Sequence, residues 1–269
     1  QAGDAQLLLR RRPAGCTLGP SMIGLEASSV NKLYDRFSQS PDYKEAGVLR
    51  DMDFDARRLF QMYDPSGNVV EIYAYLRNVR EEILWRKEYR IVYYSWEFDT
   101  LQSFYRDLLR LPQMYGWYTS PVDRGCKFKI GDNRLELICR HPTLPQGPAG
   151  MRLEAKDIEL CYANLKKEPR VTVIRPLQSH PWGEYSFCIK DPVGNWVEVY
   201  QRSEQYRPMG ADDGGCYFTD EYTAILFAED LEKITAFYRD SMQMPVVTSW
   251  DRGPEDRGCR LRSAGGFTD

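Results

Sequence analysis

Two glutamates, Glu71 and Glu198, stand at the same position of a ten-residue stretch that occurs twice in the chain. The copies are residues 64–73 (DPSGNVVEIY) and residues 191–200 (DPVGNWVEVY). Asp-Pro opens a turn, Gly and Asn tolerate positive φ within it, and the alternating residues that follow predict a strand with the glutamate on one face. A carboxylate held there can bind a divalent metal ion or act as a general acid or base.

Other repeated segments indicate the elements that must position these carboxylates. FYRD ends an amphipathic stretch at residues 104–107 and again at 237–240, and DRGC recurs at residues 123–126 and 256–259. Each Asp-Pro motif closes a segment that reads as one strand, one helix and two or three further strands. The sequence therefore predicts an α+β fold built from four βαβββ repeats.

The two ends of the chain resemble parts of one continuous stretch. Residues 123–141 contain a strand, in GDNRLELICR, that has no counterpart after GCRLRSAGG near the end of the chain. The beginning, GDAQLLLRRR, resembles that strand. We therefore expect residues 4–12 to pair with residues 258–264, which would make a circularly permuted module. The alternatives are a fragment of a longer tandem array and an exchange of strands with a partner.

The chain resembles the vicinal oxygen chelate superfamily, which includes glyoxalase I, type I extradiol dioxygenases, fosfomycin-resistance enzymes and bleomycin-resistance proteins. The Asp-Pro-x-Gly-Asn-x-x-Glu endings, the WGEYSF strand before the second ending and the FYRD helix ends carry the resemblance. It implies that βαβββ units pair in a curved sheet around a cavity, so that four units make two cups. The expected modules are residues 1–75 with 221–269, and residues 90–203. Residues 76–89, expected to be partly helical, and residues 204–220 would be linkers.

The resemblance also implies where a metal would be held, on the first and last strands of two paired units. In the 90–203 module the last strands place Glu136 and Glu198 there, and the first-strand positions fall near Arg90 and Gly150. The corresponding positions of the permuted module hold Glu71, Leu8, Thr223 and Met22. The only two histidines, His141 and His180, fall on no such position. We therefore expect no metal cofactor; if a divalent ion is bound, its ligands would be Glu136, Glu198 and Glu71.

Aromatic residues are abundant, with 18 Tyr, 6 Trp and 11 Phe, and they predict an aromatic-lined cavity for a flat ligand. We expect a metal-free small-molecule binding protein of the bleomycin-resistance type, which sequesters an aromatic natural product or drug. The predicted ligand-binding residues are Arg90, Tyr94, Trp117, Glu136, Trp182, Trp196, Glu198, Tyr200 and Glu71. The alternatives are a glyoxalase-like lyase, isomerase or dioxygenase that uses a divalent metal or cavity carboxylates, and a structural or regulatory role.

Composition excludes several other classes of protein. The formal net charge of the 269-residue chain is −3, which gives no electrostatic basis for binding nucleic acid. No apolar run is long enough to predict a transmembrane helix. The seven cysteines are scattered without metal-site spacing, which favours reduced thiols and a cytoplasmic location. A homodimer is a possible assembly.

Overall fold

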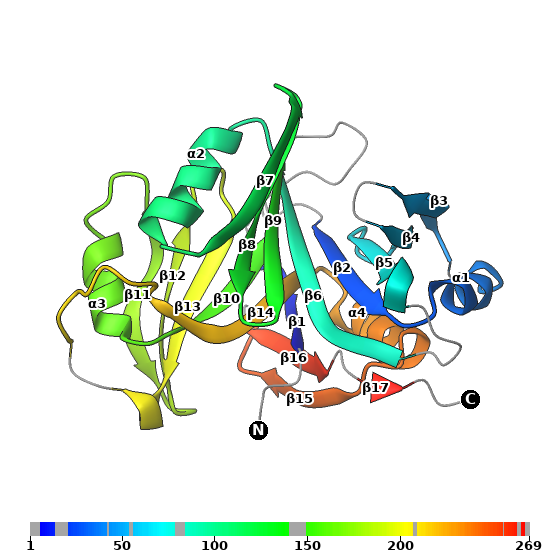
Figure 1. Ribbon diagram of the computed structural model, residues 1–269. Coiled ribbons are helices and arrows are strands. Elements are labelled where there is room, and N and C mark those ends of the chain that lie inside the picture. The colour runs from blue at the N-terminus through cyan, green and yellow to red at the C-terminus, as the bar shows by residue number, and fades with distance from the viewer. Residues whose placement is uncertain are drawn as a thin grey trace. The chain divides into compact units, whose positions relative to one another are not determined.

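A computed structural model gives the structure of residues 6–13, 21–41, 43–53, 56–78, 84–139, 149–206, 209–254, 256–262 and 265–266 (Figure 1). The chain divides into two compact units. Unit 1 comprises Gln1–Val92 and Ile225–Asp269, and unit 2 comprises Tyr93–Ala224.

The four expected βαβββ repeats are present. The first contains β2 (Met22–Ala27), α1 (Val30–Ser38), β3 (Glu45–Met52), β4 (Arg57–Tyr63) and β5 (Val69–Tyr75). The second contains β6 (Leu84–Ser95), α2 (Phe98–Ser103), the π-helical turn η2 (Phe104–Leu108), β7 (Gln113–Ser120), β8 (Asp123–Ile130) and β9 (Asn133–Cys139). The third contains β10 (Gly150–Ala155), α3 (Ile158–Leu165), β11 (Thr172–His180), β12 (Glu184–Lys190) and β13 (Trp196–Arg202).

The fourth repeat is completed by the strand near the beginning of the chain. It contains β14 (Phe218–Ala228), α4 (Leu231–Ala236), the π-helical turn η4 (Phe237–Ser241), β15 (Val246–Asp251), β16 (Arg257–Arg262) and β1 (Gln6–Arg11). Strands β1 and β16 are antiparallel, with Gln6 opposite Arg262 and Arg10 opposite Gly258. The expected pairing of residues 4–12 with 258–264 is therefore confirmed within one chain for residues 6–10 and 258–262.

The strands form two mixed sheets, so the expected α+β architecture is confirmed. One sheet has the order β11-β12-β13-β10-β14-β1-β16-β15. The other has the order β3-β4-β5-β2-β6-β9-β8-β7, and the short β17 (Gly265–Gly266) also pairs with β6. In both sheets the first and last strands of a motif-bearing repeat are parallel neighbours, β2 beside β5 and β10 beside β13.

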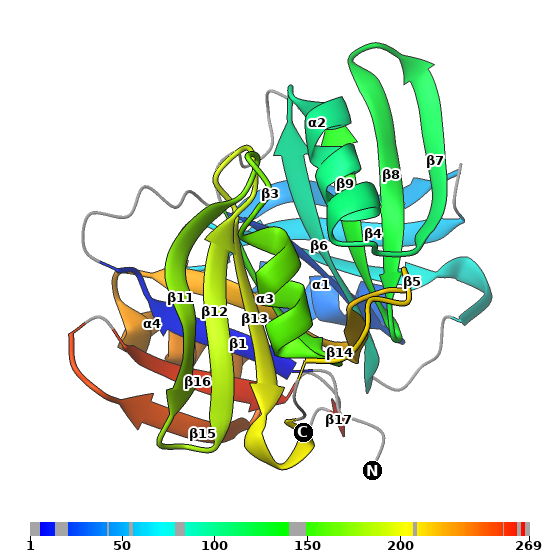
Figure 2. The same cartoon turned by 90° about the vertical axis from the view of Figure 1, so that its left-hand side faces the viewer.

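Helices α1 and α3 each bury an apolar stripe against their own sheet, as an amphipathic helix must. In unit 1, α1 buries Val30, Leu33 and Phe37, and the ring of Phe37 lies 6.4 Å from that of Phe60 on β4. In unit 2, α3 lies across β12 and β13 (Figure 2), where the rings of Tyr162 and Phe187 are 5.1 Å apart. This packing leaves the opposite face of each group of strands for the polar side chains described below.

The expected linker at residues 76–89 begins with a 3-10 turn, η1 (Leu76–Asn78), and from Leu84 onward its residues belong to β6. Trp85 on β6 is buried, pairs with Ala27 on β2 and donates from Nε1 to the Met242 carbonyl at 2.9 Å. These contacts fix the segment as a strand.

Glu136 and Glu198 were also expected in one cavity, but they lie on strands of different sheets, β9 and β13. Strand β9 belongs to the second repeat, which shares a sheet with the first repeat. Strand β13 belongs to the third repeat, which shares a sheet with the fourth repeat and β1. Among the described residues, no helix is long and apolar enough to cross a membrane. The six cysteines in the described ranges are free thiols.

Candidate functional site

The repeated Asp-Pro turns hold their strands in place with a closed set of hydrogen bonds. In unit 2, Asp191 accepts hydrogen bonds from the backbone N–H groups of Val193 and Asn195 and from the Tyr105 hydroxyl, at 3.0, 2.8 and 2.9 Å. Asn195 in turn accepts from the Ala149 N–H at 2.9 Å, which ties the start of β10 to β13. Burial raises the pKa of Asp191 to about 6, although the hydrogen bonds oppose that shift. These motif residues therefore position the strands rather than face a ligand.

Glu71 is the centre of a buried ion cluster in unit 1. Its Oε1 accepts from Arg57 at 3.2 Å and from Arg90, and its Oε2 accepts from Gln61 Nε2 at 2.9 Å. Both Arg90 and Glu71 are buried, with side-chain exposures of 5% and 4%. Burial alone would raise the pKa of Glu71, but the charges of Arg90 and Arg57 and these hydrogen bonds lower it below its ordinary value.

The shape of this cluster depends on a glycine and a tyrosine. Gly24 on β2 lies between Glu71 and Arg90 in the strand pairing. A Cβ on Gly24 would lie 2.7 Å from Arg90 Cγ. The absence of a side chain on Gly24 therefore allows the Arg90 side chain to cross β2 and reach Glu71. The guanidinium carbons of Arg57 and Arg90 lie 5.2 and 5.1 Å from the ring centroid of Tyr73, within cation–π range.

Glu198 has a corresponding cluster in unit 2. Its Oε1 accepts from Arg152 Nε at 2.9 Å, and its Oε2 accepts from Arg175 Nη2 at 3.2 Å. Arg152 also donates to Glu184 at 2.6 Å, and its guanidinium lies 3.7 Å from the ring centroid of Tyr200. Burial opposes the charged form of Arg152, but Glu198 and Glu184 raise its pKa above the ordinary value.

This cluster continues through β12 toward an exposed aromatic edge. Trp182 donates from Nε1 to Glu184 at 3.0 Å and stacks on His180, with ring centroids 4.3 Å apart and planes 15° apart. His180 Nε2 lies 2.7 Å from Ser186 Oγ, and Arg175 donates to the same hydroxyl at 3.4 Å. A continuous polar and aromatic surface therefore runs from buried Glu198 to Trp182, which is 43% exposed.

Glu136 has a different partner, also within unit 2. Lys127 Nζ lies 3.5 Å from Glu136 Oε1, and both side chains are buried. The same ammonium lies 5.2 Å from the ring centroid of Tyr115 on β7. This carboxylate is therefore neutralised by a lysine on the neighbouring strand.

The structure brings some of the predicted site residues together and separates others. Glu198, Tyr200 and Trp182 belong to the Glu198 cluster, while Glu71 and Arg90 belong to the Glu71 cluster. Half-buried Trp196 pairs with Gly150 two positions before Glu198 on β13. Trp196 therefore lies on the same face of β13 as Glu198. Tyr94, Trp117 and Glu136 lie on β6, β7 and β9, in the sheet that does not contain Glu198. The indole of Trp117 covers Gly125 on β8.

Sequence reasoning missed the residues that face the glutamates on the first strands. Gly150 and Met22 were expected there, but Arg152 pairs with Glu198 and Gly24 pairs with Glu71. A signal existed, because aligning GMRLEA with MIGLEA places Arg152 opposite Gly24. His180 was also set aside as a loop residue, whereas it ends β11 and contacts Ser186. His141 lies outside the described residues.

Residues 96–199 match the family model "Glyoxalase/Bleomycin resistance protein/Dioxygenase superfamily". This part of the chain therefore has the sequence pattern of a domain of this superfamily. Among solved structures, glyoxalase I from Zea mays is similar at 14% identity and a TM-score of 0.54, over 72% of this chain and 70% of that one. This likeness shows a shared fold.

Two smaller structures each match 42% of this chain at 23% identity. They are lactoylglutathione lyase from Agrobacterium tumefaciens, with 90% of it covered and a TM-score of 0.35, and TnmS3, an antibiotic binding protein from a Streptomyces species, with 93% covered and a TM-score of 0.36. No match to this chain was found among curated proteins.

A tightly bound divalent metal ion needs several oxygen or nitrogen donors around one point, and the side chains here do not fit that requirement. No group of three or more His, Cys, Asp or Glu side chains that could hold a metal ion exists within the described residues. The oxygens of Glu71 and Glu198 already accept from guanidinium groups, and Glu136 faces an ammonium. An arginine beside each of the two motif carboxylates opposes the approach of a divalent cation.

Proposed function

We propose that the protein binds a small aromatic molecule without a metal, in the manner of the bleomycin-resistance type. The observation that carries this proposal is the pairing of each carboxylate at the expected metal-ligand positions. Glu71 and Glu198 are each held by two arginines, and Glu136 is held by Lys127. A metal could bind only after these buried ion pairs were broken, and removing one partner from a buried pair costs about 3–5 kcal/mol.

The Glu198 cluster supplies surfaces that suit a flat organic ligand. Trp182 and His180 form a stacked pair at its exposed end, and Arg175, with a side chain 33% exposed, offers a planar cation between them and Glu198. Aromatic and guanidinium planes both stack on flat rings, and their N–H groups can orient an acceptor on the ligand. A ligand bound there would contact the aromatic rings of Trp182 and His180 at one end and the charged groups around Glu198 at the other.

One observation favours the alternative, an enzyme related to glyoxalase. His180 Nε2 lies 2.7 Å from Ser186 Oγ in the same cluster, so a histidine that could accept a proton faces the proposed ligand surface. The motif glutamates are poorer candidates for this role. The lowered pKa of Glu71 keeps it ionised, and its oxygens are occupied by three donors.

Two measurements on the purified protein test the proposal. Elemental analysis should find well under one equivalent of iron, nickel, manganese or zinc, and a chelator should leave ligand binding unchanged. A screen of planar aromatic natural products by tryptophan fluorescence should find ligands whose affinity falls in Trp182→Ala and Trp196→Ala. Loss of a central aromatic anchor typically costs about 2 kcal/mol, or roughly thirtyfold in Kd.

Matched variants make the binding test specific. Trp96→Ala removes a tryptophan that is 51% exposed and lies outside the Glu198 cluster, so it should leave the affinity unchanged. Glu198→Gln should weaken binding less than the loss of either stacking tryptophan. Near one equivalent of a transition metal, with binding or turnover abolished by chelation, would overturn the proposal and favour the enzyme.

A further inference from the structure

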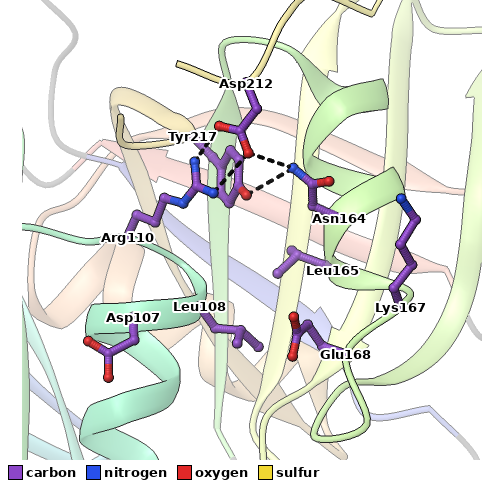
Figure 3. Close-up of a pocket in the computed structure, with 9 residues that line it drawn as sticks. All are labelled: Asp107, Leu108, Arg110, Asn164, Leu165, Lys167, Glu168, Asp212 and Tyr217. Atoms are coloured by element: carbon purple, nitrogen blue, oxygen red, sulfur yellow. Dashed lines mark hydrogen bonds and ion pairs between the residues drawn. The ribbon is translucent and has the colours of Figure 1, made fainter. Parts of the chain in front are cut away.

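Unit 2 contains a cavity away from the Glu198 cluster, with a volume of about 270 Å³. It lies between the end of η2, the end of α3 and the segment that leads into β14 (Figure 3). Leu108 and Leu165 supply its apolar surface. At roughly 30 Å³ per molecule of water, it has room for a small organic ligand.

One wall of the cavity is a fixed hydrogen-bonded cluster. Arg110 donates to both oxygens of Asp212, at 2.5 and 2.9 Å, and its guanidinium lies 4.4 Å from the ring centroid of Tyr217. Asn164 Nδ2 donates to Asp212 and to the Tyr217 hydroxyl, both at 3.1 Å. Asp212 and Arg110 therefore neutralise each other, and this wall offers little net charge to a ligand.

Glu168 is the acidic lining residue whose carboxylate has no partner among the described residues. Asp107, the other acid at the cavity, accepts from Arg106 at 2.7 and 2.9 Å and from Ser103. Across the described ranges of the chain, the Glu168 side chain has no ion pair or hydrogen bond. Figure 3 shows its carboxylate pointing into the space between Leu108 and Leu165, while the Lys167 side chain points away from it. The C-terminal ends of η2 and α3 add partial negative charge at the same place.

The internal repeat shows that the fold does not require this charged lining. In unit 1 the same FYRD turn ends at Gln243, which matches Arg110, and both have positive φ, 52° and 55°. Aligning α1 with α3 places Gln39 and Ser40 where unit 2 has Lys167 and Glu168. Unit 1 thus builds the same helix ends without the acid, so Glu168 is not needed to end a helix.

We propose that this cavity binds a small organic ammonium ion, with the nitrogen at the Glu168 carboxylate and the apolar part against Leu108 and Leu165. The Arg110–Asp212–Tyr217 cluster would form the wall that limits the length of the ligand. This site is independent of the proposed aromatic ligand of the Glu198 cluster.

Three compounds of similar shape but different charge test whether the cavity prefers a cation: benzylammonium, benzyl alcohol and benzoate. Titration into the full chain, followed by calorimetry or by NMR, should give benzylammonium a Kd at or below about 1 mM. Benzyl alcohol should bind at least tenfold more weakly, and benzoate should not bind. Raising the salt concentration should weaken the binding of benzylammonium, because an exposed ion pair is screened.

The chain itself supplies the variants. Glu168→Ser installs the residue of the unit 1 repeat and should weaken benzylammonium binding at least tenfold, whereas Lys167→Gln should leave it within about twofold. Glu168→Gln gives a second test if the serine variant melts earlier. Trp196→Ala should have no effect, which separates this site from the aromatic one. Equal binding by wild type and both Glu168 variants, a preference for benzoate, or no binding of any probe would overturn the proposal.

Discussion

Glu71 in unit 1 and Glu198 in unit 2 occupy the same place in a repeated motif, yet their arginines come from different strands. Arg152 stands directly beside Glu198, on β10. The corresponding position beside Glu71 is Gly24, and Arg90 reaches across it from β6. The tyrosine two residues after each glutamate also contacts arginine: Tyr73 lies near both Arg57 and Arg90, and Tyr200 lies near Arg152.

The second arginine that contacts each glutamate also comes from a different strand in the two units. Glu71 takes it from Arg57 on β4, whereas the equivalent residue on β12 is Glu184, which binds Arg152. Glu198 instead takes its second cation from Arg175 on β11. Two different arrangements therefore reach the same local result, a buried glutamate with two guanidinium partners. The comparison indicates that neutralising the carboxylate matters to each unit, and that no single residue position is required for it.

The largest expected effect comes from removing Arg152, and a comparison with the removal of Arg90 tests which of the two clusters depends more on a single arginine. Arg152→Ala leaves buried Glu198 with Arg175 alone, whose side chain is 33% exposed, and removes the guanidinium from Glu184, so the free energy of unfolding should fall by about 3–5 kcal/mol. Arg90→Ala should cost less, because Arg57 and Gln61 still hold Glu71. Denaturant unfolding measures both. Arg239→Ala is the control, because both side chains of its ion pair with Asp240 are exposed, and it should cost under about 1 kcal/mol. A smaller loss for Arg152→Ala than for Arg90→Ala would contradict the comparison.

The aspartates of the two motif turns allow a pH test. The folded pKa of Asp191 is raised to about 6 from an ordinary 3.8, chiefly by burial. Proton binding therefore favours the folded state, and this contribution is fully present below pH 3.8 and is lost as pH rises through about 6. The loss should reach roughly 3 kcal/mol, at about 1.4 kcal/mol per pKa unit.

Asp191→Asn should remove that part of the pH dependence of unfolding. Burial also raises the pKa of Asp64, so Asp64→Asn should change the profile in the same direction. Unfolding measured from pH 4 to pH 7 decides the matter. If the free energy of unfolding of Asp191→Asn still falls as pH rises, groups other than Asp191 cause the pH dependence.

The smallest expected effect comes from converting one cluster into the other. Gly24→Ala places a Cβ against Arg90 and should cost about 1–3 kcal/mol, because the guanidinium must leave its path. The double variant Gly24→Arg with Arg90→Thr moves the arginine to the strand that carries it in unit 2. It should recover most of the stability lost by Arg90→Ala. If thermal unfolding shows that the two changes simply add, the clusters are not interchangeable.

The repeats made most of the fold readable from the sequence. The Asp-Pro turns, the FYRD helix ends and the DRGC segments predicted four βαβββ repeats, and the match of the chain ends predicted the pairing of β1 with β16. The repeats did not predict which strands share a sheet. Local patterns specify which face of β9 or β13 is buried, but not which repeat supplies the neighbouring strand, so Glu136 and Glu198 were wrongly placed together.

The site was harder to predict for a related physical reason. A strand has a side-chain period of two, so Gly150 and Arg152 lie on the same face and the hydrophobic pattern alone does not distinguish them. The ion pairs of Glu71 with Arg90 and of Glu198 with Arg175 join residues on different strands, and their partners follow only from strand register. His180 was passed over because its contact with Ser186 arises from the pairing of β11 with β12.

The pairing of β1 with β16 also bears on the order in which the chain can fold. Unit 2 is one continuous segment, whereas unit 1 is assembled from residues before and after it. During synthesis, β1 emerges before unit 2 and its partner β16 after it, so unit 2 can form while β1 still lacks that partner. Closing this loop costs only about 0.6 kcal/mol more than closing a loop of half its length, because the cost depends on the logarithm of loop length. The greater consequence is kinetic, because strands this far apart in sequence find each other slowly.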